Sequence, residues 1–358
     1  MRARELGLPL AGTPGPNNAI TDVPGVEVGY TTLVEGDAVR TGVTAILPRG
    51  RDAAEVPCAA GWYSLNGNGE MTGTAWLSET GSLRLPVLIT NTHAIGPCHR
   101  GVIDWVVREK PQVASEWLLP VVAETWDGYL NDINGPHVTS AHAVAAIDAA
   151  GSGPVAEGSV GGGTGMNCYG FKGGSGTSSR LVEYGADRYA VGAFLQANFG
   201  SRKELTVCGV PVGAALASDN PMEEQDWASP PGAGSVIVVI STDAPLLPGQ
   251  CTALARRVPL GLARTGTTGS HFSGDIFLAF STGNPGALAG GFPRGEETYD
   301  VLRFIPWNRM DAFFEAVVQS AEEAVLNALV AADTMVGRDG HRSPGLPVPA
   351  MLELLKLR

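Results

Sequence analysis

The sequence has little of what several binding and catalytic classes depend on. Only four of its 358 residues are lysines, basic residues form no run, and the formal net charge is −12. Such a chain cannot neutralise a row of phosphates, which excludes a nucleic-acid surface. The chain lacks an apolar run of membrane-spanning length, and its first residues lack the apolar core of a signal peptide. We therefore expect a cytoplasmic protein with no nucleic-acid or membrane partner.

Cysteine and the common catalytic motifs are sparse as well. The five cysteines lie at least 40 residues apart, a spacing that fits neither a disulfide framework nor a zinc site. His137 and His142 are five residues apart and do not share a helix face. There is no G-x-S-x-G or H-E-x-x-H motif, and Lys172 in the glycine-dense segment 159–180 is not followed by Ser or Thr, as a phosphate-binding loop requires. We expect no metal and no cofactor.

The residues that are present predict helices layered on sheets, of mixed α/β character. Apolar and β-branched runs favour strands, and apolar residues at intervals of three and four favour helices. Between them, residues 218–234 are polar, acidic and rich in proline and glycine, so we expect an exposed and mobile linker. The predicted strands include 42–47, 85–90, 189–198, 235–240 and 275–280, and the predicted helices are 139–150, 246–257 and 310–332.

The junction of this linker with the strand that follows it places Gly234 before Ser235. If the bond between them were cut, Ser235 would carry a hydroxyl and a free α-amine on one residue. An α-amine has a pKa of about 7.7–8.0, which suits a general base near neutral pH. Such a residue activates its own hydroxyl without a histidine. On the pattern alone, the commoner interpretation is that Gly-Ser simply begins a strand.

The junction resembles the self-processing site of the DmpA/BapA family of L-aminopeptidase/D-esterases and β-peptidyl aminopeptidases. The similar residues are 234–239 and 242–247. The resemblance runs through nearly the whole chain, and so many matches in the same order are not a chance result. The further matching segments are 18–26, 67–73, 91–94, 127–133, 161–166, 171–174 and 273–277.

The resemblance implies roles for individual residues. Ser235 is the nucleophile, and cleavage after Gly234 leaves an α chain of residues 1–234 and a β chain of residues 235–358. Ser273 matches a serine that hydrogen-bonds the nucleophile region. Asp275 matches a carboxylate that is Glu in the best-known members, and it is one methylene shorter. Residues two apart on a strand face the same way, as a shared site requires; without the resemblance, Asp275 is an ordinary turn residue.

Two further residues take roles at the reacting carbonyl by the same resemblance. Asn198 matches an asparagine of the oxyanion hole, whose contribution to catalysis is typically about 3–4 kcal/mol. Tyr129 matches a tyrosine that lines the site and stabilises the same oxyanion. In isolation, Asn198 is a turn residue at a strand end and Tyr129 is a core aromatic.

An enzyme that reads only N-termini needs an anion for the substrate's amine. The candidates are Glu70, Glu124, Asp127 and Asp132, and the sequence does not rank them. Each is individually an ordinary surface charge. Lys172 is a further candidate for contact with the substrate.

The sequence therefore predicts an α-β-β-α sandwich that resembles N-terminal-nucleophile hydrolases with a different connectivity. Residues 1–358 would form one structural domain, processed into two chains and assembled as a homo-oligomer of αβ units. The expected substrate is a short peptide or an amino-acid amide or ester, cleaved through an acyl-enzyme. The alternatives are an amide-oligomer hydrolase, an acyltransferase similar to ornithine acetyltransferase, and an uncleaved binding protein of the same fold.

Overall fold

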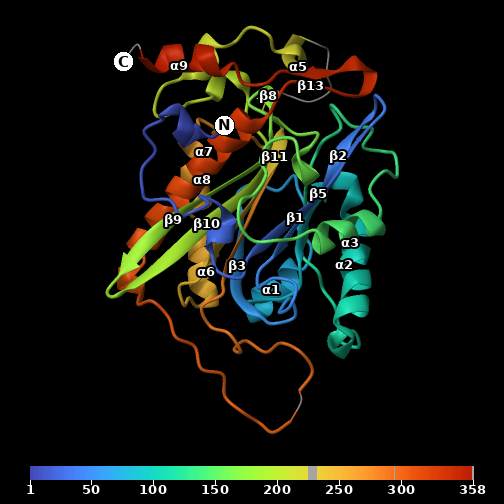
Figure 1. The fold of residues 1–358 in the computed structure, drawn as a ribbon, viewed down its shortest axis with the longest axis vertical. Helices are drawn as coiled ribbons and strands as arrows, with labels where there is room; N and C mark the ends of the chain where they lie inside the picture. The colour runs from blue at the N-terminus through green and yellow to red at the C-terminus, as the bar shows by residue number, and fades with distance from the viewer. Residues whose placement is uncertain (225–231, 294, 357–358) are drawn as a thin grey trace.

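Two β-sheets stack face to face in the computed structural model, which describes residues 1–224, 232–293 and 295–356 (Figure 1). The four-stranded sheet has the order β1-β2-β5-β6, and the six-stranded sheet has the order β4-β3-β12-β11-β10-β9. Most neighbouring strands are antiparallel, but β5 with β6 and β11 with β12 are parallel. The strands of the smaller sheet are β1 (Glu27–Glu35), β2 (Val39–Leu47), β5 (Val87–Asn91) and β6 (Val122–Thr125). Those of the larger sheet are β3 (Cys58–Ser64), β4 (Ser82–Leu83), β9 (Gly174–Tyr184), β10 (Asp187–Asn198), β11 (Gly234–Thr242) and β12 (Ser273–Ser281).

Helices cover the outer face of each sheet, which completes the predicted α-β-β-α sandwich. Helices α2 (Ile95–Glu109) and α3 (Ser140–Asp148) pack on the smaller sheet. On the larger sheet lie α6 (Pro248–Ala255), α7 (Val258–Ala263) and α8 (Asp311–Ala331). The shorter elements are α1 (Thr74–Thr80), α4 (Val212–Ala215), α5 (Pro221–Glu224), α9 (Val348–Lys356), β7 (Asn167–Cys168), β8 (Phe171–Lys172), β13 (Met335–Val336) and β14 (Arg342–Ser343).

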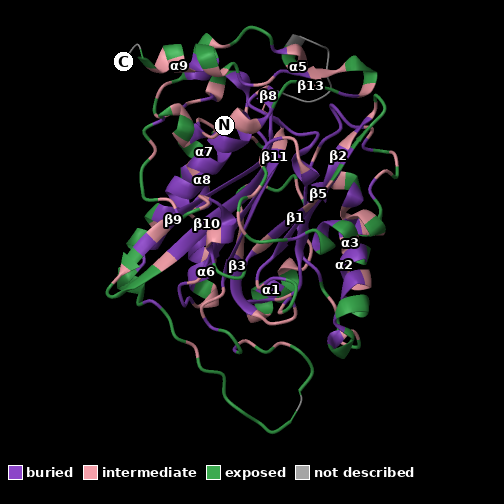
Figure 2. Cartoon of the chain, viewed as in Figure 1, coloured by how far each residue is buried: buried purple, intermediate pink, exposed green. Residues whose placement is uncertain are grey.

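The central strand β11 shows why this sequence builds two layers of core. Val236 and Val238 pack toward α6–α8, whereas Ile237 and Val239 pack between the two sheets. The strand is therefore buried on both faces, as its β-branched run predicts, and Figure 2 shows the central strands buried throughout. Burying each such side chain stabilises the fold by about 1.5–3 kcal/mol.

The helix predictions hold with small changes at the ends. Thr139 stands at the N-cap of α3, as expected, and α8 ends one residue before the predicted limit. The predicted helix 246–257 is shortened to α6, which ends before Arg256, and α7 follows it as a separate helix that was not predicted from the sequence. On α8 the carboxylate of Glu323 is buried and bonds Arg180 at 2.7 Å, so this polar position faces the protein.

The linker prediction holds for the exposure of Ser218 and Asp219 but is wrong at Asn220. Asn220 is only 4% exposed, because the chain before it is held against the body of the protein. The buried guanidinium of Arg202 donates to the backbone carbonyls of Leu216 and Ser218 at 2.8 and 3.1 Å. Residues 225–231 of the predicted linker lie outside the described residues.

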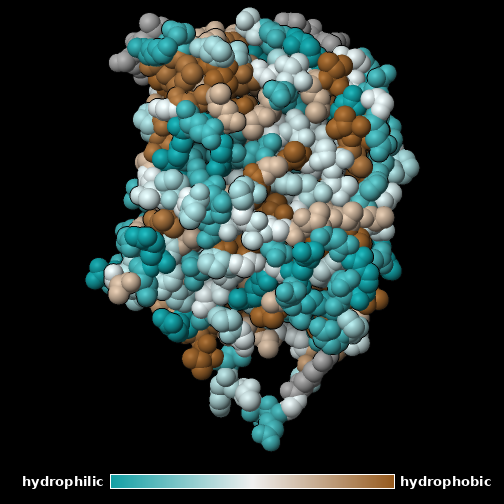
Figure 3. Space-filling model, in the orientation of Figure 1, coloured by the Kyte–Doolittle hydropathy of each residue, from teal (hydrophilic) through white to brown (hydrophobic). Residues whose placement is uncertain are grey.

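The surface is mainly polar on the side drawn in Figure 3, where hydrophilic residues gather over α2 and α3. Beneath this surface, the inner face of α2 buries Val102, Trp105 and Val106. Within the part of the chain that the structure describes, no helix combines the length and the apolar character needed to cross a bilayer.

Candidate active site

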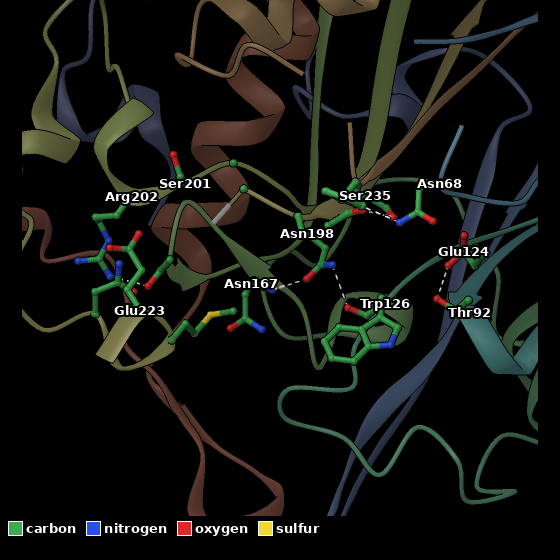
Figure 4. Close-up of a pocket in the computed structure, with 18 residues that line it drawn as sticks. Asn68, Thr92, Glu124, Trp126, Asn167, Asn198, Ser201, Arg202, Glu223 and Ser235 are labelled. Carbon is green, nitrogen blue, oxygen red and sulfur yellow. Dashed lines mark hydrogen bonds between the residues drawn. The ribbon is translucent and has the colours of Figure 1, made fainter. Parts of the chain in front are cut away.

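A cavity of about 640 Å³ opens at the edge of the sandwich where β10 ends and β11 and β12 begin (Figure 4). Because β11 and β12 run parallel, their first residues lie side by side. Strand β6 of the smaller sheet ends at the same edge, so both sheets contribute walls. The lining includes Asn68, Thr92, Glu124, Trp126, Asn198 and Ser235.

Ser235 lies in the cavity wall at the start of β11, with only 2% of its surface exposed. Its position is fixed on both sides, because it pairs with Asn198 of β10 and with Gly274 of β12. The Ser235 hydroxyl donates a hydrogen bond of 2.6 Å to the carbonyl oxygen of Gly234. The nucleophilic oxygen is therefore held beside the peptide bond that precedes it.

Gly234 is required here for a reason of space. A Cβ at this position would come within 1.9 Å of the carbonyl oxygen of Asn198. The φ of Gly234 is not in the left-handed region, so glycine is not needed here for its backbone freedom. Any side chain at this position would push β10 and β11 apart next to Ser235. This is why glycine precedes the serine.

Ser273 and Asp275 face the same way from β12, as the two-residue period predicts. Both are buried, and the Ser273 hydroxyl donates to Oδ1 of Asp275 at 2.5 Å. Burial raises the pKa of Asp275 above its ordinary value, while hydrogen bonds from Ser273, Asn66 and the Val236 amide act in the opposite direction. Asp275 thus lies beside Val236, the residue that follows Ser235, in the parallel pair of β11 and β12.

The side chain of Asn198 is held at the cavity wall by two hydrogen bonds. Its Oδ1 accepts from the backbone amide of Asn167 at 2.8 Å, and its Nδ2 donates to the carbonyl of Trp126 at 2.9 Å. These bonds fix which end of the amide is the donor. The second N–H of Nδ2 remains for an oxygen in the cavity, the arrangement that an oxyanion hole needs.

Glu124 is the buried carboxylate that lines the cavity. The Thr92 hydroxyl donates to one of its oxygens, and the backbone amide of Glu70 donates to the other at 2.9 Å. Burial raises the pKa of Glu124, and these two hydrogen bonds lower it by less. Figure 4 shows Glu124 and Thr92 together on one side of the cavity, with Ser235 between them and Arg202.

The other acidic candidates lie outside the cavity. The side chain of Glu70 is exposed, and only its backbone contacts Glu124. Asp132 bonds His137 at 3.0 Å. Asp127 is fully buried behind the wall, bonded by Asn131 at 3.0 Å, and burial raises its pKa to about 7.

Lys172 and Tyr129 are also enclosed by protein. The Lys172 ammonium donates to the carbonyls of Met166 and Gly173, each at 2.8 Å, and burial lowers its pKa to about 7. The Tyr129 ring stacks on His341 with centroids 4.7 Å apart, and its hydroxyl donates to the carbonyl of Arg342 at 3.3 Å. Neither residue is part of the cavity lining.

Several residues of the cavity lining were not predicted from the sequence, among them Thr92 and Trp126, and neither was Asn66, which bonds Asp275. Thr92 lies within the matching segment 91–94, and Trp126 directly precedes the matching segment 127–133. The directions of their side chains depend on where β5 and β6 end. Asn66 precedes the matching segment 67–73 by one residue. Among the described residues, no three or more His, Cys, Asp or Glu side chains are grouped to hold a metal ion.

Comparison with known proteins agrees with this geometry. The model of peptidase family S58 matches residues 18–343. The β-peptidyl aminopeptidase BapA of Sphingosinicella microcystinivorans is 49% identical, over 99% of this chain and 92% of that protein. BapA of Sphingosinicella xenopeptidilytica is 45% identical, over 100% of this chain and 91% of that protein.

A solved structure extends the agreement to the fold. The L-aminopeptidase D-Ala-esterase/amidase of Ochrobactrum anthropi matches with a TM-score of 0.93 and 44% identity, over 99% of this chain and 98% of that one. It is described as a prototype of the serine aminopeptidases and as a new variant of the Ntn hydrolase fold. The resemblance and fold class predicted from the sequence are thereby confirmed. The chain belongs to peptidase family S58, and it is a hydrolase of the serine aminopeptidase type.

Proposed function

We propose that this chain cleaves itself between Gly234 and Ser235 and then uses the freed Ser235 to hydrolyse short peptides and amino-acid amides or esters. The two products, residues 1–234 and 235–358, remain together as one structural domain. The observation that carries the proposal is the 2.6 Å hydrogen bond from the Ser235 hydroxyl to the carbonyl of Gly234, at the wall of the cavity.

Self-cleavage follows from this placement. The Ser235 oxygen attacks the Gly234 carbonyl carbon, the C–N bond breaks, and the acyl group moves to the oxygen while the nitrogen becomes an amine. Water then hydrolyses the ester, which leaves a carboxylate on Gly234 and a free α-amine on Ser235. No cofactor or metal takes part in this scheme.

In the processed enzyme, the α-amine of Ser235 takes the proton from its own hydroxyl as that oxygen attacks the substrate carbonyl. The free N–H of Asn198 donates to the oxyanion that forms. Ser273 and Asp275, bonded at 2.5 Å beside the start of β11, orient the amine and balance the charge that it gains. The scissile bond of the substrate breaks, and its amine or alcohol leaves with the proton from the α-amine. Water then hydrolyses the Ser235 ester, which releases the acyl group and restores the enzyme.

Glu124 supports the choice of substrates with a free N-terminal amine. It is the buried carboxylate in the cavity wall, and a substrate ammonium would satisfy it in a site from which water is largely removed. Relatives named β-peptidyl aminopeptidase and L-aminopeptidase D-Ala-esterase/amidase support the same substrate class. We assign the amine-binding role to Glu124 over Glu70, Asp127 and Asp132.

Assembly and location complete the proposal. We expect a homo-oligomer of αβ units in the cytoplasm; the family resemblance supports the first, and the unpaired thiols of all five cysteines support a reducing compartment. Light scattering on the purified protein would measure the assembly, with a mass equal to one αβ unit contradicting it.

The test compares Ser235→Ala with the matched control Ser241→Ala, which removes a buried hydroxyl from the same strand. We expect Ser235→Ala to stay a single chain and to lose hydrolysis of amino-acid p-nitroanilides, while Ser241→Ala cleaves itself and remains active. Scission of the Ser235→Ala chain would overturn the proposal. Transfer of acetyl from acetylornithine to glutamate, without anilide hydrolysis, would establish the acyltransferase instead.

A further inference from the structure

Asn66 lies where strand β3 leaves the larger sheet. The pairing of β3 with β12 ends at Ser64 and Ile276, but the chain continues beside β12. The Leu65 amide donates to the carbonyl of Asp275 at 2.9 Å. The hydrogen-bond partner of the Asp275 backbone amide is a side chain and not a strand carbonyl: the amide donates to Oδ1 of Asn66 at 2.6 Å.

The same side chain also binds the carboxylate of Asp275. Nδ2 of Asn66 donates to Oδ2 of Asp275 at 2.9 Å, and to the carbonyl of Ser270 at 2.9 Å. The other carboxylate oxygen, Oδ1, accepts from Ser273. Asn66 thus contacts Asp275 at two points, and both of its N–H groups and its carbonyl are used.

We propose that Asn66 is a positioning residue that acts through Asp275: it fixes the rotation of the carboxylate and keeps it ionised beside the freed amine of Ser235. The inference rests on the proposed function. One oxygen of the short Asp275 side chain accepts from Ser273, and Asn66 holds the other oxygen in place. An amide does not titrate, so this support is constant across the working pH range.

The surroundings of Asp275 make its protonation depend on Asn66. Burial raises the pKa of the carboxyl, and the groups that oppose this are Ser273, Asn66 and the Val236 amide. None of the three is charged, and among the described residues no charged side chain contributes to the shift. Removing one neutral donor therefore moves the pKa of Asp275 upward. Self-cleavage adds one cation beside this carboxyl, the freed α-amine of Ser235.

The experiment measures kcat and kcat/KM against pH for the processed wild type, Asn66→Ala, Asn66→Asp and Ser64→Ala. Ser64→Ala is the matched control, because the Ser64 hydroxyl donates to the backbone carbonyl of Asn66 at 2.5 Å and has no bond to Asp275. The α-amine of Ser235, which must be neutral to act as the base, sets the upper part of the acid limb. We expect the lower part, where Asp275 takes up its proton, to move up by about one pH unit in Asn66→Ala and further in Asn66→Asp, since a second carboxyl faces Asp275. KM should stay within about threefold, because Asn66 lies outside the amine contact of Glu124.

An acid limb that stays at the wild-type pH in both Asn66 variants would overturn the inference, and so would an equal movement in Ser64→Ala. If an Asn66 variant is cut more slowly than the wild type, the pH dependence of its self-cleavage rate is compared with that of the wild type; an unmoved profile again overturns the inference. A wild type that is active without being cut contradicts the proposed function instead, so the two failures are distinguishable.

Discussion

The wall of the cavity and the layer directly behind it contain the same kinds of side chain in opposite situations. Glu124, in the wall, has both carboxylate oxygens bonded yet still lines the space beside Ser235. Asp127, three residues later, is sealed behind the wall, as is the ammonium of Lys172. The residue type alone does not distinguish the two regions. What decides whether a side chain lines the cavity or lies behind the wall is its position relative to the end of β6.

The layer behind the wall still matters to the site, because it holds the wall in place. Lys172 binds carbonyls on both sides of the glycine-rich turn at residues 166–173. That turn also supplies the Asn167 amide that orients Asn198. We therefore expect changes in the wall to act on substrate binding and changes behind it to act on stability.

The largest effect should come from Glu124→Gln. Removing the charge that faces the substrate ammonium should lower kcat/KM for amino-acid p-nitroanilides by about 100-fold or more, mainly by raising KM. In the wild type, KM should rise as the pH falls through the raised pKa of Glu124, because protonation removes the same charge. This rise should be absent from the variant, as steady-state kinetics at several pH values would show.

The matched control is Glu70→Gln, which removes an exposed carboxylate and leaves the backbone bond to Glu124 in place. We expect its KM to stay within about twofold of the wild type. A larger loss of kcat/KM in Glu70→Gln than in Glu124→Gln would contradict our assignment of the amine-binding role to Glu124.

Lys172→Met should mainly reduce stability. It removes the donor from buried carbonyls of Met166 and Gly173, which should lower the free energy of unfolding by about 2–3 kcal/mol. The change is measured by urea unfolding, with the exposed Lys203→Met as the control. A tenfold rise in KM at unchanged stability would instead show that Lys172 contacts substrate.

Asp127→Asn should give the smallest effect at neutral pH, and an effect on stability that grows as the pH falls. Burial raises the pKa of Asp127 to about 7, against about 3.9 in an unfolded chain. Between these values the folded state binds more protons than the unfolded state, so the Asp127 contribution to stability falls as the pH rises. The variant should lose this fall, about 3 kcal/mol between pH 4.5 and 7.5, in free energies of unfolding from urea titrations. Parallel curves for the two proteins would contradict the burial of this charge.

The sequence was sufficient where local pattern and burial agree. The β-branched run of β11 predicted a strand buried on both faces, and α8 follows its apolar spacing. Ser273 and Asp275 were expected to face one way, and the bond between them confirms it. These features depend on periods of two and of 3.6 residues, which a sequence displays directly.

The rest depended on how distant segments meet. Whether Trp126 or Tyr129 lines the cavity is decided by the turn after β6, and the burial of Asn220 is decided by Arg202. The partner of Asp275 is Asn66, more than 200 residues away in the chain. No local pattern in the sequence contains such contacts.

The most direct measurement is the mass spectrum of the purified, active wild-type protein, with N-terminal sequencing of any smaller chain. We predict two chains, of residues 1–234 and 235–358, the second beginning Ser235-Val236-Ile237. Full hydrolytic activity in a protein that remains one uncut chain would contradict the account.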